Sequence, residues 1–563
     1  MSGARLARAA TLFRGVSGHS YVLNVLALSG TLGLAFGHPG VAMAAWPVGL
    51  LLLVAFTYPG VTRFWAAAEP AGMFVLARAV VLAGVALVAP EDTTARLALI
   101  LLAVALLAES PLRALSASDF PVVSRLPGLA HRRPTWVSPG TSFVANTLVL
   151  ALAAAAALAE RRADSVLLAA GALTLAVTVV AGIALVLRVR DRQRVEAGLH
   201  RALSEHGPRF VLHWDAPAGT AYQVAMWLPY LERLGERFVV LVRSSANFDE
   251  VVRLTDAPVV LRKGLTDLDS VVTPSMKVAF YVNTATKNCH YVRYTQMTHI
   301  QLNHGDSDKA PSFNPVFRMY DKNFVAGQAA IDRFATHGVS MPQEMFAIVG
   351  RPQVEHVAVA TAPISTVGAP TVLYAPTWAG FYADSNYCSL GTGVAMVQTL
   401  LDRGARVVFR PHPYARKHAR YAAACDEIIA LLARDRETTG RDHLFGTRAE
   451  REMSVVDCFN ASDAMIADVS SVVPDYLFSE KPFAMVAVSR PAATFAAEFP
   501  IAEAAYVVDG HKGRLQGFGD VLDQMLGSDP LATTRRERKV YYLGDIPAAT
   551  YAQRFLDEAR AFL

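Results

Sequence analysis

The chain has 563 residues, enough for several domains, and 53% of them are hydrophobic while only 18% are charged. This composition is too apolar for an ordinary soluble chain. The net charge is only +5, and the arginines cluster in short loops beside apolar segments, so they indicate membrane topology and not a nucleic-acid footprint. The four cysteines lie far apart, which excludes a metal-binding spacing and a disulfide framework and fits a reduced compartment.

Apolar runs in the first third of the chain predict membrane-spanning helices. A spanning helix needs about 20 mostly apolar residues, and several of the runs are shorter, so four or five spans stay open beside the six that we expect. We predict a transmembrane region over residues 1–190 and a linker over 191–208. The six runs are 21–36, 41–57, 72–88, 97–108, 143–158 and 165–187.

Arginines in the connecting loops predict how these helices cross the membrane, because lysines and arginines near spans favour the cytoplasmic side. With six spans, the N-terminus, the loop with Arg63, the loop from Arg113 to Arg133 and the stretch Arg188–Arg192 fall on one side. Only the turn Glu160–Arg162 goes against the rule. We therefore expect a multi-pass protein of the plasma membrane whose termini and later domains lie in the cytoplasm.

One ionisable residue, Arg78, lies inside the third apolar run. An ionised side chain within a membrane is costly and often functional. A long arginine side chain near a helix end can also reach the interface, or the span can be shifted along the sequence. We prefer these structural interpretations of Arg78.

From Arg209 onward, short β-branched or aromatic runs alternate with helix-length amphipathic segments, which is the pattern of βαβ units around a parallel sheet. The alternation restarts after a segment rich in prolines and small residues, which we interpret as a linker between two lobes. Predicted strands are 210–214, 238–242, 259–261, 278–282, 299–302, 322–326, 372–375, 407–410, 464–468 and 483–488. Predicted helices are 221–234, 328–337, 393–403, 415–432, 472–479 and 548–563, and the linker is 350–368.

Two Rossmann-like lobes, residues 209–355 and 368–563, closed by a terminal helix make the architecture called GT-B in glycosyltransferases. The fold class that we expect is therefore an N-terminal α-helical transmembrane region followed by an α/β GT-B fold. The sequence contains no convincing glycine-rich dinucleotide fingerprint or Walker loop, which speaks against a nicotinamide enzyme or an NTPase. We expect neither a metal nor another cofactor.

The candidate base in the first lobe is His304, which directly follows a predicted strand and precedes a glycine. A histidine at a strand end faces the edge where open α/β sheets bind ligands. Lys309 lies near enough to share the site, and Asp306 or Asp308 can orient the imidazole or raise its pKa, as the partner of a base does. The alternative is a polar loop whose histidine is merely solvated.

Two polar turns follow predicted strands of the second lobe. Thr377 in Tyr374–Trp378 can donate to a phosphate, whereas Trp378 more simply caps the core. Arg410 in the sequence RPHP suits a phosphate because its planar fork offers paired donors. His412 in the same turn can add a third donor or move a proton near neutral pH. A plain surface turn is the alternative for RPHP, because Pro-x-Pro sequences punctuate many chains.

A third turn of the second lobe places Ser470 and Ser471 at the start of a predicted helix. Exposed amides at a helix N-terminus carry partial positive charge and bind phosphate, and serine hydroxyls extend such a site. Simple N-capping by either serine needs no ligand. Asp475, one turn further on, can reach a ribose or a substrate hydroxyl, or it can complement the helix dipole.

Together these motifs resemble the CDP-glycerol glycerophosphotransferase family, the teichoic acid primases and polymerases, from about Arg209 to the C-terminus. They occur in the order HG with a lysine four residues after the glycine (304–309), YAPTW (374–378), RPHP (410–413) and D-x-SS-x-x-x-D-Y (468–476). The resemblance implies a GT-B fold and transfer of a polyol phosphate from a CDP-polyol to an acceptor hydroxyl, with release of CMP. By that resemblance, His304 matches the proposed base, and His412, Ser470 and Ser471 match positions around the donor pyrophosphate.

The chain departs from the family in two ways. It has Asp306 and Ser307 where relatives often have threonine and proline, which bears on the acceptor chemistry, and it brings its own membrane spans. Our hypothesis is a membrane-anchored transferase that moves a polyol phosphate, most simply glycerol phosphate, to a lipid-linked or cell-envelope polymer. The alternatives are a GT-B glycosyltransferase that uses a nucleotide sugar, and a catalytically silent nucleotide-binding scaffold.

Overall fold

The computed structural model describes residues 16–57, 73–89, 92–116, 121–126, 129, 139–159, 164–380 and 386–563. The chain forms two compact units. The first consists of Met1–Val122 with Gly128–Leu199, and the second consists of Val123–Pro127 with His200–Leu563.

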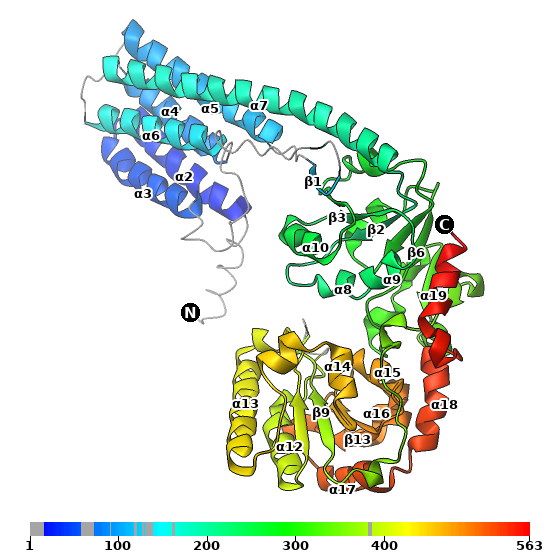
Figure 1. Ribbon diagram of the computed structural model, residues 1–563. Coiled ribbons are helices and arrows are strands. Elements are labelled where there is room, and N and C mark those ends of the chain that lie inside the picture. Colours follow the sequence, from blue (N-terminus) through cyan, green and yellow to red (C-terminus); the bar gives the residue numbers. More distant parts are fainter. Residues whose placement is uncertain are drawn as a thin grey trace. The chain divides into compact units, whose positions relative to one another are not determined.

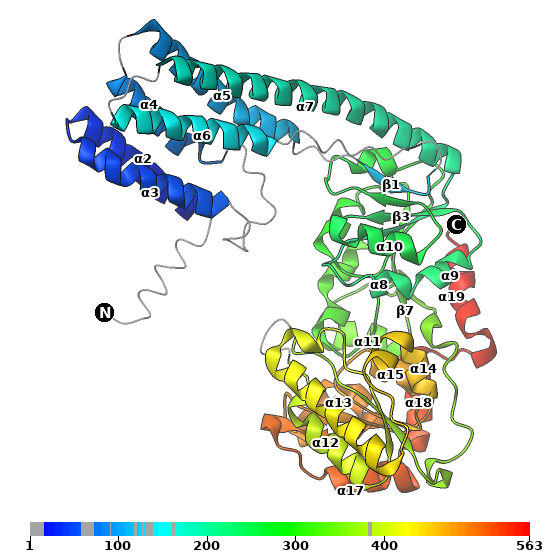
Figure 2. The same ribbon diagram turned by 60° about the vertical axis from the view of Figure 1, so that its left-hand side comes forward.

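The first unit is a bundle of helices that lie side by side (Figure 2). One helix occurs at each of the six predicted apolar runs, and four described helical segments are long and apolar enough to cross a membrane: Pro39–Thr57, Thr93–Ala114, Gly140–Leu158 and Ser165–His206. Most of the loops that carry the orienting arginines, including those with Arg63 and Glu160–Arg162, lie outside the described residues, so the orientation stays a prediction. The helices are α2 (Val16–Ala35), α3 (Pro39–Thr57), α4 (Val75–Val88), α5 (Thr93–Ser116), α6 (Pro139–Leu158) and α7 (Asp164–His206).

The segment expected to be a linker, residues 191–208, is largely helical, because α7 continues to His206. Its arginines, glutamates, alanines and leucines are strong helix formers. Arg192 and Glu196 also form an ion pair one turn apart at 3.4 Å. The helix ends at Gly207, which adopts the left-handed conformation (φ 60°) that a helix C-terminus favours.

Arg78 does not reach the surface of the helix bundle, contrary to the interpretation that we preferred from the sequence. Its side chain is buried and binds Glu109 of α5 through two hydrogen bonds, Nη1 to Oε1 at 2.8 Å and Nη2 to Oε2 at 2.6 Å. Asn146 of α6 donates to the same carboxylate at 2.9 Å. Because the opposite charge lies within the bundle, Arg78 can stay inside it.

The first lobe of the second unit is a sheet whose strands lie in the order β1-β4-β3-β2-β5-β6-β7-β8 (Figure 1). Strands β2 to β8 pair in parallel, and from β4 to β7 their order is that of a Rossmann fold. The short strand β1 (Val122–Ser124) comes from the segment between α5 and α6. The others are β2 (Phe210–Trp214), β3 (Phe238–Val242), β4 (Val259–Leu261), β5 (Val278–Tyr281), β6 (Thr298–Gln301), β7 (Lys322–Val325) and β8 (Phe346–Ile348).

Of the two helices expected in this lobe, one differs from expectation. The segment predicted as a single helix over 221–234 is broken into α8 (Tyr222–Ala225) and α9 (Leu228–Glu232). Pro229 at the start of α9 cannot donate a backbone hydrogen bond, so the first helix ends before it. The lobe also contains α10 (Phe248–Leu254) and α11 (Gln328–Thr336).

The second lobe is a parallel sheet in the order β10-β9-β11-β12-β13, the flavodoxin-like variant of the same fold. The expected linker contains two short 3-10 turns, Pro352–Val354 and Ile364–Thr366. The strands are β9 (Thr371–Ala375), β10 (Arg406–Phe409), β11 (Ala464–Ala467), β12 (Phe483–Ala487) and β13 (Tyr506–Asp509). The helices are α12 (Leu390–Asp402), α13 (Ala419–Thr439), α14 (Val455–Asn460), α15 (Val472–Leu477), α16 (Ala492–Glu498) and α17 (Phe518–Asp523).

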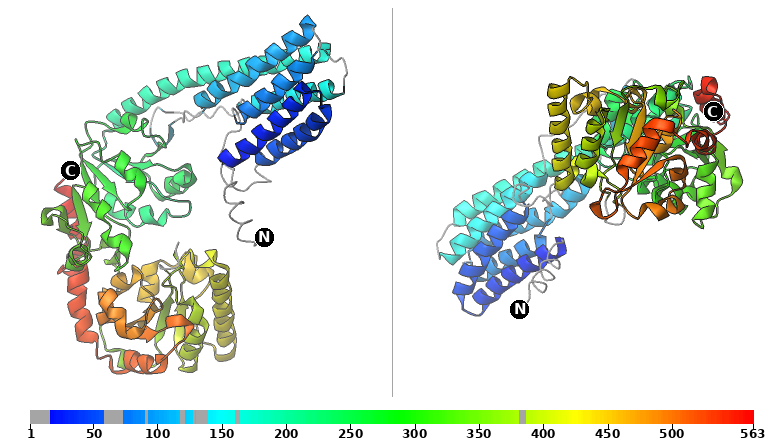
Figure 3. Two further views of the ribbon diagram at one scale, coloured as in Figure 1. Left: turned by 180° about the vertical axis from the view of Figure 1, so that it is seen from behind. Right: turned by 90° about the horizontal axis from the view of Figure 1, so that it is seen from below.

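The C-terminal segment returns from the second lobe to the first (Figure 3). Helix α18 (Ala532–Leu543) packs against α15 of one lobe and α11 of the other. Helix α19 (Tyr551–Arg560) places Phe555 between Trp227 and Phe324 of the first lobe, with ring centroids 5.1 and 6.2 Å away. Two Rossmann-like lobes closed by C-terminal helices confirm the expected GT-B architecture.

We expect Gly327→Ala to destabilise the junction between α11 and α18. A Cβ at Gly327 would lie 2.6 Å from the Tyr541 carbonyl oxygen, and backbone cannot yield as a flexible side chain does. Overpacking of this kind costs about 1–3 kcal/mol. The free energy of unfolding of the full chain, measured with denaturant, checks this. Gly368→Ala is the matched control, because no atom lies within 4 Å of its added Cβ, and equal stability of the two variants would contradict the prediction.

Candidate functional site

The three motifs of the second lobe follow neighbouring strands. Thr377 follows β9, RPHP follows β10, and Asp468 with its serines follows β11. The strand order reverses between β9 and β11, and open α/β sheets bind ligands at such a switch point. The Thr377 amide donates to Asp468 Oδ2 at 2.7 Å, which ties the turns on either side of that point together.

His304 is held in a defined tautomer by the first lobe. Its Nδ1 lies 2.8 Å from the Val282 carbonyl oxygen, which can only accept, so Nδ1 carries the proton and Nε2 keeps its lone pair. Burial lowers the pKa of His304, and nearby Arg351 lowers it further, so the imidazole is neutral at neutral pH. The preceding Asn303 adopts a left-handed conformation (φ 59°), and its carbonyl accepts from Trp227 Nε1 at 2.5 Å. His304 is thus prepared as a proton acceptor.

His412 is held in the opposite tautomer. Its Nδ1 accepts a hydrogen bond from the Tyr414 amide at 3.0 Å, so in the neutral ring Nε2 carries the proton. Burial lowers the pKa of His412 to about 4, and Lys309 and Lys417 add to the shift. The ring stacks on Trp378 with centroids 6.0 Å apart. His412 therefore offers a neutral N–H donor and not a base at physiological pH.

Lys309 connects the first lobe to the turns of the second. Burial lowers the pKa of Lys309 to about 8, although the Asp468 carboxylate opposes the shift. Its ammonium lies 5.1 Å from the centre of the Tyr387 ring, and its charge reaches His412. Lys309 supplies a partly buried, titratable positive charge beside both Asp468 and His412.

Further contacts bring the His304 loop against the second lobe. A Cβ added to Gly305 would lie 2.8 Å from Ser471 Cβ, so this glycine permits the close approach. Tyr222 lies edge-on to His304 with ring centroids 6.3 Å apart, and Tyr414 lies 5.7 Å from the His412 ring. The structure therefore brings His304, Lys309, His412, Thr377 and Ser471 into one neighbourhood.

Arg410 points elsewhere. Its Nη1 donates to the backbone carbonyls of Ala449 and Met453, the latter at 2.8 Å, and lies 3.9 Å from Cys458 Sγ. These bonds satisfy carbonyls around the π-helical turn Arg448–Glu452, so the side chain holds the second lobe together. Its predicted contact with a phosphate has no support in this geometry.

The carboxylates proposed to assist catalysis form ion pairs between elements. Asp306 binds Arg333 of α11, with Oδ1 2.5 Å from Nη1, and does not orient His304. Asp475 binds Arg351, which lies in the segment between the lobes. This pair occupies the carboxylate for which a ribose, a substrate hydroxyl and the helix dipole were the alternatives. Burial raises the pKa of Asp475, although Arg351 opposes the shift.

The two serines precede the short helix α15. Ser471 is its N-cap residue, yet its side chain makes no capping hydrogen bond, which argues against the purely structural alternative for this hydroxyl. The Ser470 carbonyl accepts from the Val473 amide at 3.2 Å. Thr377 is buried beside Asp468. The Ser471 hydroxyl therefore lies beside the His304 loop, and no capping role explains it.

Asp468 is a residue that sequence reasoning placed in a motif but did not assign to the site. It is fully buried, and burial raises its pKa to about 6, although hydrogen bonds from Ser389 and Thr377 oppose the shift. Among the described residues, Oδ1 of Asp468 has no hydrogen-bond partner. Its place directly after a strand and two residues before Ser470 was the signal that pointed to it.

Asp215 and Lys287 were also not predicted from the sequence. They pair at 3.2 Å near the switch point of the first sheet, where Asn283 donates to the Asp215 carbonyl at 3.0 Å. Neither residue belongs to a motif, so only the strand order reveals them. In the part of the chain that the structure describes, no group of three or more histidine, cysteine or acidic residues is arranged to hold a metal ion.

Comparisons with known proteins agree with this arrangement. Residues 346–490 match the model of the CDP-Glycerol:Poly(glycerophosphate) glycerophosphotransferase family. This range contains YAPTW, RPHP and the serine motif. A search of the curated proteins finds no match.

Several solved structures are similar over about two thirds of the chain. The wall teichoic acid polymerase TagF has 14% identity and a TM-score of 0.40, over 66% of this chain and 94% of that chain. A putative UDP-N-acetylglucosamine 2-epimerase from Listeria monocytogenes has 12% identity and a TM-score of 0.42, over 63% and 96%. A glycosyltransferase from Rickettsia africae has 10% identity and a TM-score of 0.39, over 63% and 98%.

With TM-scores this low, the fold assignment rests on the strand order of the chain itself, and the similarity to the family rests on the match over residues 346–490 and on the motifs within it. This match supports the resemblance to the CDP-glycerol glycerophosphotransferase family that the ordered motifs of the sequence indicate.

Proposed function

We propose that this chain is a membrane-anchored transferase that moves a polyol phosphate, glycerol phosphate first of all, from a CDP-polyol to a hydroxyl of a lipid-linked or cell-envelope polymer. The family supports a transferase of this type. The observation that carries the proposal is the pair of histidines in opposite tautomers, His304 with a free Nε2 lone pair and His412 with a free Nε2 proton. The lone pair of His304 can accept the proton of an attacking hydroxyl. The N–H of His412 can donate to a phosphate oxygen.

In the proposed reaction His304 takes the proton of the acceptor hydroxyl at Nε2. The acceptor oxygen attacks the β-phosphorus, and the bond from that phosphorus to the bridging oxygen breaks. The electron pair leaves with CMP. General-base assistance of this kind contributes about 10²–10⁴-fold to the rate.

The donor diphosphate lies in this proposal against the second lobe. His412 Nε2–H and the hydroxyls of Ser470 and Ser471 donate to its oxygens, while Lys309 supplies positive charge. Donors that are fixed before the reaction stabilise charge that develops on the leaving group at little cost in reorganisation. No metal ion is required by this set of groups, and we propose metal-independent transfer on that ground.

The proposal is tested with native membranes that contain the full chain. They are incubated with CDP-glycerol, CDP-ribitol or nucleotide sugars, and the released nucleotide is identified. We expect CMP from a CDP-polyol, and His304→Ala should lower its release by about 100-fold or more. Donor binding, measured on the purified variant, should change little, because His304 faces the acceptor.

His356→Ala is the matched control, because this exposed histidine stands outside the site and should leave turnover unchanged. Release of a nucleoside diphosphate from a nucleotide sugar would establish the glycosyltransferase alternative. Donor binding without turnover on any acceptor would establish a silent scaffold. Undiminished CMP release from His304→Ala would remove this histidine from the mechanism.

Lys309 predicts how donor binding depends on pH. Because its pKa is about 8 in the free protein, the ammonium loses its proton as the pH rises through that value. A bound diphosphate favours the charged form, so affinity should fall progressively above about pH 8. Lys309→Arg stays charged at these pH values and should retain affinity to higher pH, whereas Lys309→Met should bind weakly throughout. Titrations of donor against protein at several pH values check this, and identical profiles for the unsubstituted protein and the Lys309→Arg variant would contradict it.

A native thiol reports on the proposed cytoplasmic location. Cys289 is exposed in the second unit, whereas Cys388, Cys425 and Cys458 are buried. A membrane-impermeant maleimide should therefore fail to label intact cells and should label the chain after permeabilisation. Cys289→Ser should abolish that labelling. Labelling of Cys289 in intact cells would place the second unit outside.

A further inference from the structure

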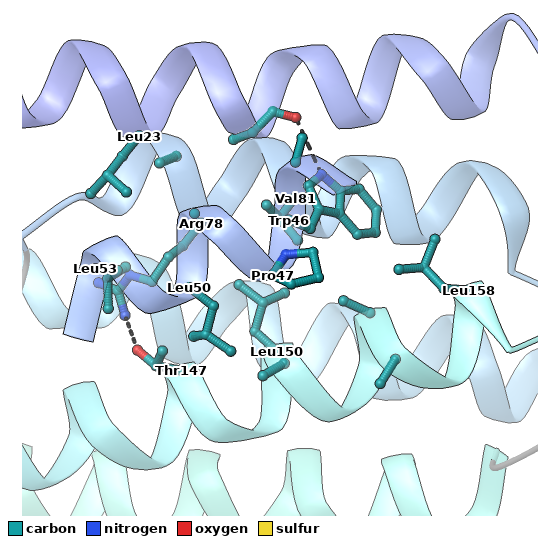
Figure 4. Close-up of a pocket in the computed structure, with 17 residues that line it drawn as sticks. Leu23, Trp46, Pro47, Leu50, Leu53, Arg78, Val81, Thr147, Leu150 and Leu158 are labelled. Carbon is teal, nitrogen blue, oxygen red and sulfur yellow. Dashed lines mark hydrogen bonds between the residues drawn. The ribbon is translucent and has the colours of Figure 1, made fainter. Parts of the chain in front are cut away.

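The helix bundle of the first unit contains a cavity of about 230 Å³ between α2, α3, α4 and α6 (Figure 4). Its wall is almost entirely apolar, and many of the residues that line it are small, among them Ala27, Ala45, Ala77, Ala151 and Ala154. Small side chains on all four helices leave the space that larger ones would fill. Such a cavity exceeds the roughly 150 Å³ of an engineered apolar cavity that stays dry and binds benzene.

Trp46 of α3 keeps the cavity open at one end. Its indole Nε1 donates to the Ala27 carbonyl of α2 at 3.3 Å. A Cβ at Gly30 would lie 2.3 Å from Trp46 Nε1, and one at Gly84 would lie 2.7 Å from Trp46 Cζ2. The ring therefore fits a slot between glycines of α2 and α4. This large rigid side chain props α3 at a fixed distance, while the alanines beside it leave a void.

The lining residues that are exposed come from α3 and α6. Pro47 and Leu50 of α3 and Ala155 of α6 line the cavity and are exposed at the surface of the bundle. The cavity therefore opens sideways between these two helices, through an apolar rim. Because α3 and α6 are both long and apolar enough to span a membrane, this rim would face hydrocarbon and not water.

The other end of the cavity is polar but electrically neutral. Arg78 lines it and donates to Thr147 Oγ1 at 3.3 Å (Figure 4). Its charge is compensated by the two hydrogen bonds to Glu109. An anionic headgroup would have to displace that carboxylate, so the cavity suits an uncharged chain.

We propose that this cavity binds one hydrocarbon chain of a bilayer lipid, which enters between α3 and α6 and ends near Arg78. The inference rests on the proposed membrane insertion of the first unit. Two sources supply such a chain, the acyl chain of a phospholipid and the isoprenoid chain of a lipid-linked acceptor. The apolar wall can contact the hydrocarbon that both kinds of chain provide.

Photo-crosslinking of the full chain in phospholipid vesicles tests the inference. One arm carries a phospholipid with a diazirine in its acyl chain, and the other carries a diazirine-labelled polyprenyl phosphate. Mass spectrometry should locate adducts on cavity residues such as Leu50 and Leu150. Cavity adducts from the phospholipid probe identify an acyl chain as the occupant, and cavity adducts from the polyprenyl probe identify an isoprenoid chain. The absence of cavity adducts from both probes overturns the proposal.

Variants that fill or close the cavity make the test specific. The double variant Ala151→Leu with Ala154→Leu should lower cavity adducts by about tenfold or more. Ala155→Trp should do the same by blocking the mouth from an exposed position, where folding tolerates a large side chain. Ala44→Leu, an exposed position of α3 outside the cavity, should leave adducts unchanged. Undiminished cavity adducts in the folded Ala155→Trp variant overturn the proposal.

Adducts on outward-facing residues separate this inference from membrane insertion itself. Leu148 of α6 is 66% exposed and should be labelled whenever the helices lie in the bilayer. Labelling of Leu148 without cavity adducts overturns the cavity proposal and leaves insertion intact. If neither Leu148 nor the cavity is labelled, membrane insertion is overturned, and the cavity proposal is overturned with it. CMP release measured on the same sample shows independently whether the transferase activity is present.

Discussion

The buried ion cluster around Arg333 fixes the loop on which the candidate site depends. Arg333 binds Asp306 at 2.5 Å and Asp308 at 3.0 Å, and Asp308 also accepts from the Ile501 amide of the second lobe at 3.1 Å. Tyr542 of α18 donates to the same carboxylate at 3.3 Å. Removing one partner of such a buried cluster typically costs about 3–5 kcal/mol. The two lobes and the C-terminal helix therefore meet at the loop that begins with His304, and the acidic residues of the loop hold it in place.

The tautomers of the two histidines follow from the backbone around them. His304 faces a carbonyl oxygen, whereas His412 faces an amide two residues further along the chain. Burial disfavours the charged form of both rings, so each keeps a single, fixed arrangement of donor and acceptor across the physiological pH range. This explains how one site can hold a proton acceptor and a hydrogen-bond donor of the same residue type. Lys309, which lies near His412, has a pKa of about 8 and therefore loses its proton just above neutral pH.

Much of the second unit is predictable from sequence, because buried parallel strands are short apolar runs between helices. Strands such as Phe210–Trp214 and Phe238–Val242 lie where the pattern places them. Helix α18 was missed because its many arginines leave only a narrow apolar face. The motifs locate the site, but they do not reveal the partner of each side chain. Arg410 and Asp475 lie in the expected turns, yet distant carbonyls and a linker arginine bind them, and only tertiary structure shows that.

Within the first unit, two polar features help to position the helices. The bond between Arg78 and Glu109, joined by Asn146, ties α4, α5 and α6 together, since separating these groups would leave a charge without a partner in an apolar environment. Helix α3 carries none of these groups and is held instead by Trp46 against glycines of α2 and α4. On the side that faces the alanine-rich α6, the side chains of α3 leave unfilled volume. The lateral opening between α3 and α6 is thus a consequence of how the charges and the indole are distributed.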